Sequence, residues 1–189
     1  MERCNWCGDD PVYVSYHDTE WGVPLRDERA MFEFLMLEGV QAGLSWITVL
    51  KRRENYRAVF DNFDVEKIAA YTDAELQRIL KDPRIIRNKL KVYAARKNAR
   101  ATLDLYGHGQ TLLGYLWGFV DGKPIQNHWK TMAEVPATTP LSEAISKDMK
   151  KRGFGFVGPT IIYAHMQATG MVNDHIVSCH RHRACAALA

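Results

Sequence analysis

Residues 37–50 read Leu37-Glu38-Gly39-Val40-Gln41-Ala42-Gly43-Leu44-Ser45-Trp46-Ile47-Thr48-Val49-Leu50. Apolar residues at helical spacing over 27–37 lead into this stretch, and Gly43 allows the chain to turn sharply before Leu44. Ser45 is a candidate cap for a second helix that continues to Phe60. Glu38 ends the apolar helix, where a charge is costly unless it is paired or used in function. The stretch predicts two helices joined by a tight turn, with a carboxylate at the end of the first.

Helical signals recur along the rest of the chain, and the connections between them are short. Further helices are expected to begin at Asp64 and at the Thr72–Glu75 capping box, and to cover 88–106, 110–120, 139–153 and 158–170. Residues 121–124 signal a turn that starts a short hairpin or an irregular loop. Asn173 or Asp174 is expected to cap a last helical turn that carries His175 and Cys179. The pattern predicts an all-α fold in which residues 1–189 form a single domain.

The composition is that of an ordinary globular protein. Of the 189 residues, 47% are hydrophobic and 25% are charged. The longest nearly uncharged stretch, Gly39–Leu50, is too short to span a bilayer. The first residues carry no charged-then-apolar signal pattern, so the protein is expected to stay in the cytosol, away from membranes. Four cysteines in a cytosolic protein favour metal ligands or free thiols over disulfides.

Basic residues are clustered, although the net charge is only +3. The clusters lie at 51–53, 84–100 and 147–152. Such clusters can neutralise the phosphates of a nucleic acid, because each contact releases a condensed counterion. Taken alone, each cluster is more readily explained as a solvated helix face.

Cysteine and histidine residues near both ends of the chain are candidate metal ligands. His175 and Cys179 are four residues apart, so a helix would place both side chains on one face. Cys4, Cys7 and His17 lie near the other end, and zinc accepts mixed sets of cysteine and histidine. The spacing leaves open whether Cys4 or Cys7 joins His17. It also leaves open a buried thiol at Cys179 and a solvent-facing His175.

Large aromatic rings crowd the first fifty residues around one carboxylate. The rings are those of Trp6, Tyr13, Tyr16, Trp21 and Trp46, and Glu38 and Gln41 fall among them. Such a set suits a pocket for a flat, cationic ligand, because the rings stack on its face and the carboxylate accepts a ring N–H. From composition alone, the simpler interpretation is that these rings belong to the core.

Several blocks of the sequence are similar to one bacterial enzyme family. The blocks are Met1-Glu2-Arg3-Cys4-x-Trp6, Tyr16-His17-Asp18-x-Glu20-Trp21-Gly22-Val23-Pro24, Leu37-Glu38-Gly39-x-Gln41-Ala42-Gly43-Leu44-Ser45-Trp46, Lys151-Arg152-Gly153-Phe154 and Gly170-x-Val172-Asn173-Asp174-His175. Together they resemble the 3-methyladenine DNA glycosylase I family, constitutive bacterial enzymes of the helix-hairpin-helix superfamily. The resemblance covers nearly the whole chain and weakens over 101–138 and after Cys179.

The resemblance implies a helix-hairpin-helix fold with two helical lobes and the base pocket between them. It implies one structural zinc per chain, on Cys4, His17, His175 and Cys179, with Cys7 outside the set. It also implies a base pocket formed by Glu38, Tyr16 and Trp46, with Trp6, Tyr13 and Trp21 nearby. One departure is Arg84, because the hairpin of this superfamily usually has a glycine there that permits close approach to phosphate.

The implied reaction is excision of 3-methyladenine from alkylated double-stranded DNA, which releases the free base and leaves an abasic site. The lesion must be flipped out of the duplex to reach the pocket. We expect Glu38 to be the catalytic residue and Leu44 with Gln41 to act as a wedge in the gap, with packing between the lobes as the alternative for Leu44. We expect a monomer, no lyase step and only a surface role for Asp104. A non-catalytic binder of methylated bases and a zinc-stapled scaffold for protein partners are competing hypotheses.

Overall fold

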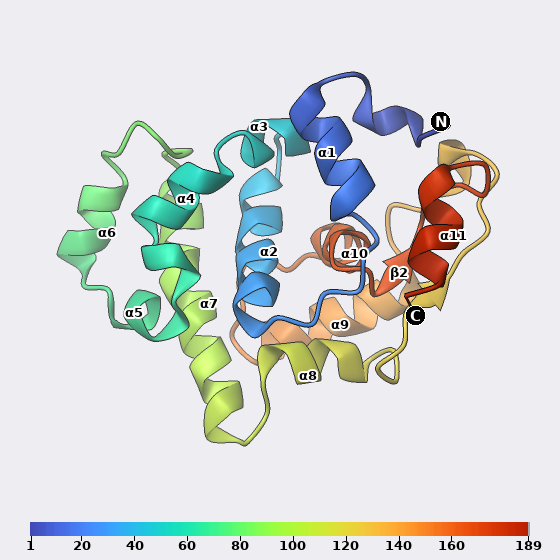
Figure 1. Cartoon of the computed structure of the whole chain (residues 1–189). Helices are drawn as coiled ribbons and strands as arrows, with labels where there is room; N and C mark the ends of the chain where they lie inside the picture. The colour runs from blue at the N-terminus through green and yellow to red at the C-terminus, as the bar shows by residue number, and fades with distance from the viewer. Residues whose placement is uncertain (189) are drawn as a thin grey trace.

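Helix α2 (Glu28–Gln41) runs through the middle of the molecule, and other helices lie around it (Figure 1). Asp27 caps its first turn by accepting a hydrogen bond from the backbone N–H of Ala30. Every residue from Met31 to Val40 is buried, so the helix is covered on all sides rather than along one stripe. The computed structural model describes residues 1–188, and none of their helices is long and apolar enough to cross a membrane. The predicted first helix is confirmed but continues past Leu37, so Glu38 lies inside its last turn.

On one side of α2 lie α4 (Arg53–Val59), α5 (Val65–Ala70), α6 (Asp73–Ile79) and the long α7 (Lys89–Gly107) (Figure 1). The 3-10 turn η2 (Asp61–Phe63) links α4 to α5. Asp64, Thr72 and Asn88 cap α5, α6 and α7, each accepting a hydrogen bond from the backbone N–H three residues further on. The helix starts predicted at these residues are therefore confirmed.

On the other side lie α1 (Pro11–Thr19), α8 (Leu112–Gly118), α9 (Pro140–Lys151), α10 (Pro159–Ala168) and α11 (His180–Ala186) (Figure 1). Helix α3 (Trp46–Leu50) contacts both α1 and α2. Two 3-10 turns, η1 (Asn5–Cys7) and η3 (Met132–Glu134), complete this side. Thr139 forms a capping box with Ser142 at the start of α9, as the Thr139-Pro140 signal indicated.

The single helix predicted from Ser45 to Phe60 is wrong, because the chain breaks it into α3 and α4. Arg52 leaves the helical region, with φ −108° and ψ 3°. After the break, Arg53 pairs with Glu33 of α2 and with Glu20, the residue that follows α1. Glu33 is only 4% exposed, so its charge requires such partners.

The last helical turn predicted to carry His175 and Cys179 is also wrong. Both residues lie in the connection before α11, and Cys179 is the N-cap of that helix. The backbone N–H of Cys179 donates to the Ile176 carbonyl at 2.8 Å, which closes a turn. The four-residue spacing thus brings the two side chains together through a turn instead of a helix.

Two short strands form a small sheet that the all-α prediction missed. Strand β1 (Ile125–Gln126) pairs in parallel with β2 (Val172–Asn173), and Ile125 lies opposite Val172. Strands of this length are too short to show an alternating pattern in the sequence. The turn predicted at 121–124 is present and leads into β1.

The segment 22–25 crosses the end of α10 in close backbone contact. Leu25 N donates to the Thr169 carbonyl at 2.9 Å, and Gly22 N donates to the Gln167 carbonyl at 3.0 Å. Gly170 follows α10 with φ +68°, and a Cβ at this position would lie 2.4 Å from the carbonyl carbon of Val23. Only glycine fits this crossing, which fixes the end of α10 beside the chain that leaves Trp21.

The two ends of the described chain also meet. The His180 backbone N–H donates to the Glu2 carbonyl at 3.1 Å, and the Ser178 hydroxyl donates to the Glu2 carboxylate at 2.5 Å. Figure 1 shows the N-terminal segment and α11 on the same side of the molecule. This contact places Cys4 near Cys179.

Candidate active site and metal centre

A cavity of about 250 Å³ gathers the tryptophan and tyrosine residues of the first fifty positions. Its lining residues are Trp6, Tyr13, Tyr16, Trp21, Glu38, Gln41, Trp46, Met132, Ala164 and Gln167. The structure therefore brings together every base-pocket residue implied by the resemblance. The volume lies below the roughly 300–1,000 Å³ of pockets for drug-sized ligands, and it suits a small, flat molecule.

Glu38 supplies the one carboxylate of this cavity lining. The residue is 3% exposed, and its Oε2 has no hydrogen-bond partner within residues 1–188. Burial raises the pKa of the Glu38 carboxyl to about 8, because a charge in a low-dielectric site lacks hydration. The group is neutral at pH 7 in the protein alone, and a cation beside it would favour the ionised form.

The rings of the cavity pack against one another at angles rather than in a parallel stack. The ring centroids of Tyr16 and Trp46 are 5.5 Å apart, and those of Trp6 and Trp21 are 5.0 Å apart. The indole N–H groups of Trp6 and Trp46 are buried without a partner in the described chain. Burial, and then the nearby Glu38, raise the pKa of the Tyr16 hydroxyl well above its ordinary value, so this hydroxyl stays protonated. The cavity thus offers aromatic faces, hydrogen-bond donors and one carboxylate to a flat ligand.

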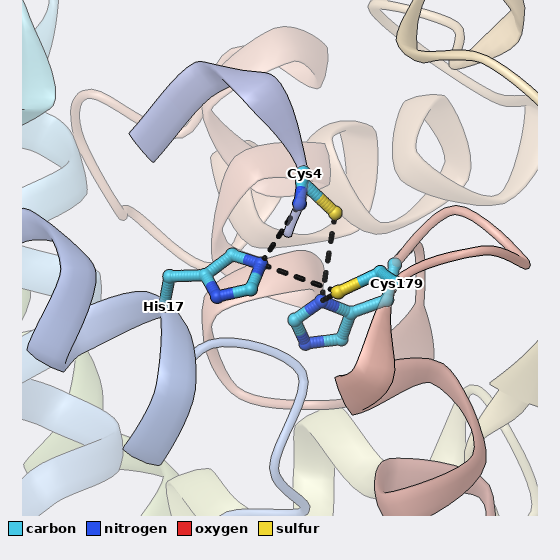
Figure 2. A group of neighbouring side chains, drawn as sticks. Cys4, His17 and Cys179 are labelled. Atoms are coloured by element: carbon cyan, nitrogen blue, oxygen red, sulfur yellow. Dashed lines mark hydrogen bonds between the residues drawn. The ribbon is translucent and has the colours of Figure 1, made fainter. Parts of the chain in front are cut away.

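Cys4, His17, His175 and Cys179 form a buried group that could hold a metal ion, and their ligand atoms lie within 4.8 Å of one another. Figure 2 shows Cys4, His17 and Cys179 pointing toward one point. The Cys179 sulfur lies 3.5 Å from His17 Nε2 and 3.5 Å from His175 Nδ1. Cys7 is not in the group, because its thiol donates to the Cys4 carbonyl at 3.2 Å. The structure therefore places Cys4, and not Cys7, beside His17, a choice that the spacing alone left open.

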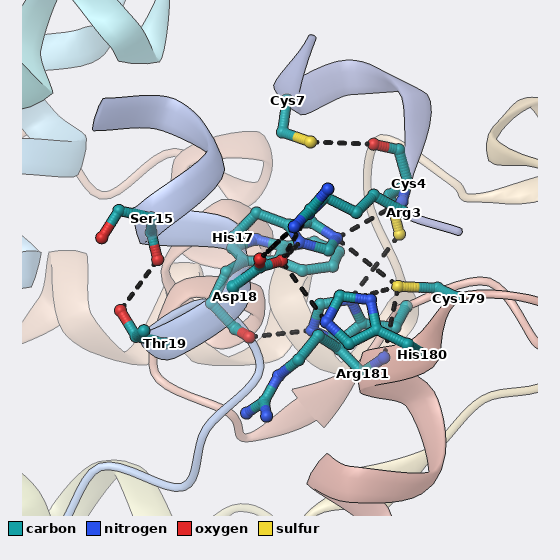
Figure 3. Close-up of polar contacts among 12 residues, drawn as sticks. Arg3, Cys4, Cys7, Ser15, His17, Asp18, Thr19, Cys179, His180 and Arg181 are labelled. Carbon is teal, nitrogen blue, oxygen red and sulfur yellow. Dashed lines mark hydrogen bonds and ion pairs between the residues drawn. The ribbon is translucent and has the colours of Figure 1, made fainter. Parts of the chain in front are cut away.

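Each histidine of the group is oriented by a hydrogen bond on its other ring nitrogen. His17 Nδ1 lies 2.7 Å from Asp18 Oδ1, and His175 Nε2 lies 2.9 Å from the Trp21 carbonyl. Arg3 holds Asp18 at 2.7 Å and keeps the pKa of that carboxyl at about 2, as part of the polar contacts in Figure 3. Hydrogen bonds, from Cys4 first and then from both histidines, lower the pKa of the Cys179 thiol. Hydrogen bonds like those of Asp18 and the Trp21 carbonyl are typical of metal-binding histidines, because they fix the tautomer of the ring.

Comparison with known proteins identifies the family. The sequence matches the family model described as Methyladenine glycosylase over residues 6–182. The chain belongs to the methyladenine glycosylase family.

Relatives of this glycosylase match it over almost its whole length. DNA-3-methyladenine glycosylase 1 of Escherichia coli (strain K12) is 51% identical over 179 residues, which are 95% of this chain and 96% of the relative. A crystal structure of 3-methyladenine DNA glycosylase I superposes with a TM-score of 0.94 at 50% identity, covering 96% of this chain and 100% of that one. The Staphylococcus aureus enzyme, whose structure addresses 3-methyladenine recognition, superposes with a TM-score of 0.92 at 34% identity, covering 95% and 96% of the two chains.

The segment between α6 and α7 of the glycosylase holds Arg84 in an ion pair. The Arg84 guanidinium contacts both carboxylate oxygens of Asp82, with Nη2 to Oδ2 at 2.7 Å. Asp82 Oδ1 also accepts from the Arg84 backbone N–H at 2.9 Å. The amide that a glycine would offer to a phosphate is therefore already bonded to Asp82.

Two further residues singled out from the sequence lie outside the metal group and the cavity lining. Leu44 follows Gly43, which has φ +79°, and its side chain is 37% exposed beside the cavity residue Gln41. Leu44 is therefore not enclosed between helices. Asp104 is exposed on α7, where its carboxylate lies 3.9 Å from His108 Nδ1. This position agrees with a surface role.

Three further residues line the cavity of this glycosylase without having been predicted from the sequence, namely Met132, Ala164 and Gln167. They come from η3 and α10, more than eighty residues after the aromatic set. No local signal marks them, because their side chains are ordinary core or surface types. The crossing of segment 22–25 over α10 and the packing of α10 against α2 hold Gln167 at the cavity.

Proposed function

We propose that this chain is a DNA glycosylase that excises 3-methyladenine from alkylated double-stranded DNA in base excision repair. The observation that carries the proposal is the Glu38 carboxyl, buried without a partner at a cavity lined by aromatic rings. Adenine methylated at N3 within DNA is flat and positively charged, and both properties match such a cavity. The Escherichia coli relative bears the name of this activity, which supports the same substrate here.

Recognition follows from the charge of the lesion. Tyr16 and Trp46 hold the faces of the base, and Glu38 accepts an N–H from its edge. The cationic base favours the ionised form of Glu38, and the exclusion of water strengthens the attraction between the two. Neutral adenine gains no such attraction, so it is bound less well.

Hydrolysis then needs little acid catalysis, because the methylated base already leaves readily. The bond between sugar C1′ and base N9 breaks, and its electron pair neutralises the positive base. Water supplies a hydroxyl to C1′ and releases a proton, which leaves an abasic sugar and free 3-methyladenine. The cavity lining within the described chain includes no lysine, which supports a reaction without a lyase step.

The flipped base leaves a gap in the duplex, and we assign the filling of this gap to Leu44 with Gln41. Leu44 is a partly exposed apolar side chain on a tight turn directly after the helix that carries Glu38. Apolar side chains at such positions wedge between base steps. Gln41 lies about one helical turn after Glu38 and lines the cavity. Its backbone carbonyl also accepts a hydrogen bond from the Leu44 N–H.

We assign DNA backbone contact to the hairpin between α6 and α7, as a helix-hairpin-helix element, with the helices on the two sides of α2 as its two lobes. The exposed residues Arg84, Arg87 and Lys89 follow one another along this hairpin and the start of α7. Their charges can neutralise phosphates. To contact a phosphate, the Arg84 guanidinium would have to release some of its hydrogen bonds to Asp82.

We assign the buried Cys4, His17, His175 and Cys179 group to one structural zinc ion. Zinc with Zn–S about 2.3 Å and Zn–N about 2.0–2.1 Å sets sulfur and nitrogen about 3.6 Å apart on a tetrahedron. The three sulfur–nitrogen separations of 3.5, 3.5 and 3.6 Å fit this edge. The protein fills all four positions, so the ion would serve to join the chain ends rather than to activate water.

We further propose that residues 1–189 act as a single domain and as a monomer in the bacterial cytosol, where the DNA is. One cavity within one chain supplies all the groups that the proposed recognition uses. No second copy is needed to complete it.

The proposed function is tested by incubating the protein with methylated duplex DNA and identifying the released bases by chromatography. The expected result is release of 3-methyladenine with one abasic site for each base. Binding of free 3-methyladenine, seen as tryptophan fluorescence quenching, without any base release would favour a binder instead. Neither release nor quenching would favour a scaffold.

A further inference from the structure

Asp174 is a buried carboxylate that accepts hydrogen bonds from four side chains. It is 0% exposed and lies in the chain between the strand β2 and His175 of the buried Cys/His group. Its Oδ1 accepts from Asn127 Nδ2 at 2.7 Å and from Trp129 Nε1 at 2.8 Å. Its Oδ2 accepts from the Tyr163 hydroxyl at 2.7 Å and from Gln167 Nε2 at 2.8 Å. A carboxylate has about four acceptor positions, so these donors fill Asp174 and are fixed by it.

Gln167 connects this carboxylate to the cavity, because it contacts Asp174 and also lines the cavity. Asp174 Oδ2 accepts from the Gln167 NH₂ group, so the Gln167 Oε1 faces away from this carboxylate. The Gln167 Oε1 takes no hydrogen bond within residues 1–188, and it is not sealed from solvent. The amide orientation is therefore set by the network, and Oε1 is left as an acceptor without a partner on a residue that lines the cavity.

The cavity lining then includes acceptors on facing elements, Glu38 on α2 and Gln167 on α10. An adenine methylated at N3 and joined to the sugar at N9 carries its N–H donors only on the exocyclic amine. Guanine has a carbonyl oxygen at the same ring position. A fixed acceptor beside this position attracts the amine and repels the carbonyl.

We propose that Gln167 is a specificity-determining residue that accepts a hydrogen bond from the exocyclic amine of the flipped base. Asp174 is the positioning residue that fixes the orientation of its amide. The inference rests on the proposed function and adds the basis on which a 6-amino purine is preferred to a 6-oxo purine. Through Trp129, the same carboxylate holds the segment that leads to Met132 at the cavity.

The test measures single-turnover release of 3-methyladenine and 3-methylguanine from the same methylated duplex. The variant Gln167→Met keeps the length of the side chain and removes its acceptor. It should release 3-methyladenine roughly 10- to 100-fold more slowly, the range for one lost hydrogen bond to a charged group. Release of 3-methylguanine should be unchanged or faster, so the ratio of the two rates falls. Gln77→Met, the same change at an exposed position on α6, is the control and should keep the wild-type ratio.

Asp174→Asn gives a second measurement, because an amide in place of Oδ2 lets the Gln167 amide rotate and present its NH₂ group. The ratio should then shift toward 3-methylguanine, with a circular dichroism spectrum like that of the wild type. An equal slowing of both bases in Gln167→Met would mean a structural role and would overturn the inference, as would an unchanged ratio. A wild-type protein that releases neither base would instead overturn the proposed function, and the inference with it.

Discussion

The Cys4 sulfur lies 3.6 Å from His175 Nδ1, although 171 positions separate the two residues in the chain. This contact joins the N-terminal segment to the turn before α11. The same N-terminal segment carries Trp6 to the cavity, and the Trp21 carbonyl holds His175 while the Trp21 ring lines the cavity. The Cys/His group and the pocket therefore both take residues from the N-terminal part of the chain, and damage to one should reach the other.

Replacement of Cys4 by Ser should remove the metal ion and loosen the pocket. Loss of one thiolate leaves an incomplete site, and the energy of metal binding is also folding energy, so the free energy of unfolding should fall by several kcal/mol. Elemental analysis and thermal unfolding measure the two effects. Cys7→Ser is the matched control, because Cys7 bonds only to nearby carbonyl oxygens, and it should keep one metal ion per chain. Stoichiometric zinc in Cys4→Ser would contradict the assignment.

Burial of Glu38 should make stability depend on pH. Its pKa of about 8 in the folded protein exceeds the ordinary value of 4.5, so the folded state holds the proton more tightly. The contribution of this group is present in full below pH 4.5 and is lost as the pH rises through 8. Relative to Glu38→Gln, the wild type should lose roughly 4 kcal/mol of unfolding free energy between pH 5 and pH 9. Denaturant unfolding at the two pH values measures this, and parallel profiles for the two proteins would refute the role of burial.

Gly170→Ala should destabilise the protein strongly. A Cβ there would lie 2.4 Å from the Val23 backbone and would also strain a φ of +68°. The expected loss is about 3 kcal/mol or more, since both the clash and the strain must be relieved. Gly109→Ala separates these causes, because Gly109 has φ +74° with nothing within 4 Å of its Cβ position. The control should lose only about 1 kcal/mol, and equal midpoints of thermal unfolding for the two variants would show that the crossing is not tight.

Lys91→Met should loosen the turn after α2. The Lys91 ammonium donates to the carbonyls of Val40 and Ala42, both at 2.6 Å, where the helix leaves its last carbonyl groups without intrahelical partners. The loss should be about 1–3 kcal/mol, and base release should slow because the proposed wedge at Leu44 follows this turn. Lys147→Met, on the exposed face of α9, is the control. Equal unfolding free energies and equal rates of base release in the two variants would show that Lys91 does not stabilise this turn.

Local signals predicted much of the fold because caps and glycines act within a few residues. Asp64, Thr72 and Asn88 each cap a helix through the backbone N–H three residues further on, so the sequence is sufficient to place them. The break at Arg52 was not predictable in this way. The break accompanies the pairing of Arg53 with Glu33 of α2, a partner that no local signal reveals.

The residues of the candidate site likewise differ in whether local sequence or long-range contacts determine their positions. The aromatic residues and Glu38 are close in sequence, so a pocket could be considered from the sequence, although composition alone favoured a core role for the rings. Gln167 is an ordinary residue whose role depends on Asp174 and on a backbone crossing far from it in sequence. The choice between Cys4 and Cys7 likewise depends on a contact with the opposite end of the chain. Spacing in the sequence does not encode this contact, whereas the resemblance to the family implies Cys4.

The central claim is that the buried Glu38 carboxylate recognises a cationic base, and its most direct test is the single-turnover rate of 3-methyladenine release by Glu38→Gln. Gln keeps the shape but carries no charge, so the rate should fall roughly 10- to 100-fold while the fold is retained. Glu143→Gln, an exposed carboxylate on α9, should release the base at the wild-type rate. A folded Glu38→Gln protein that releases 3-methyladenine as fast as the wild type would contradict the account.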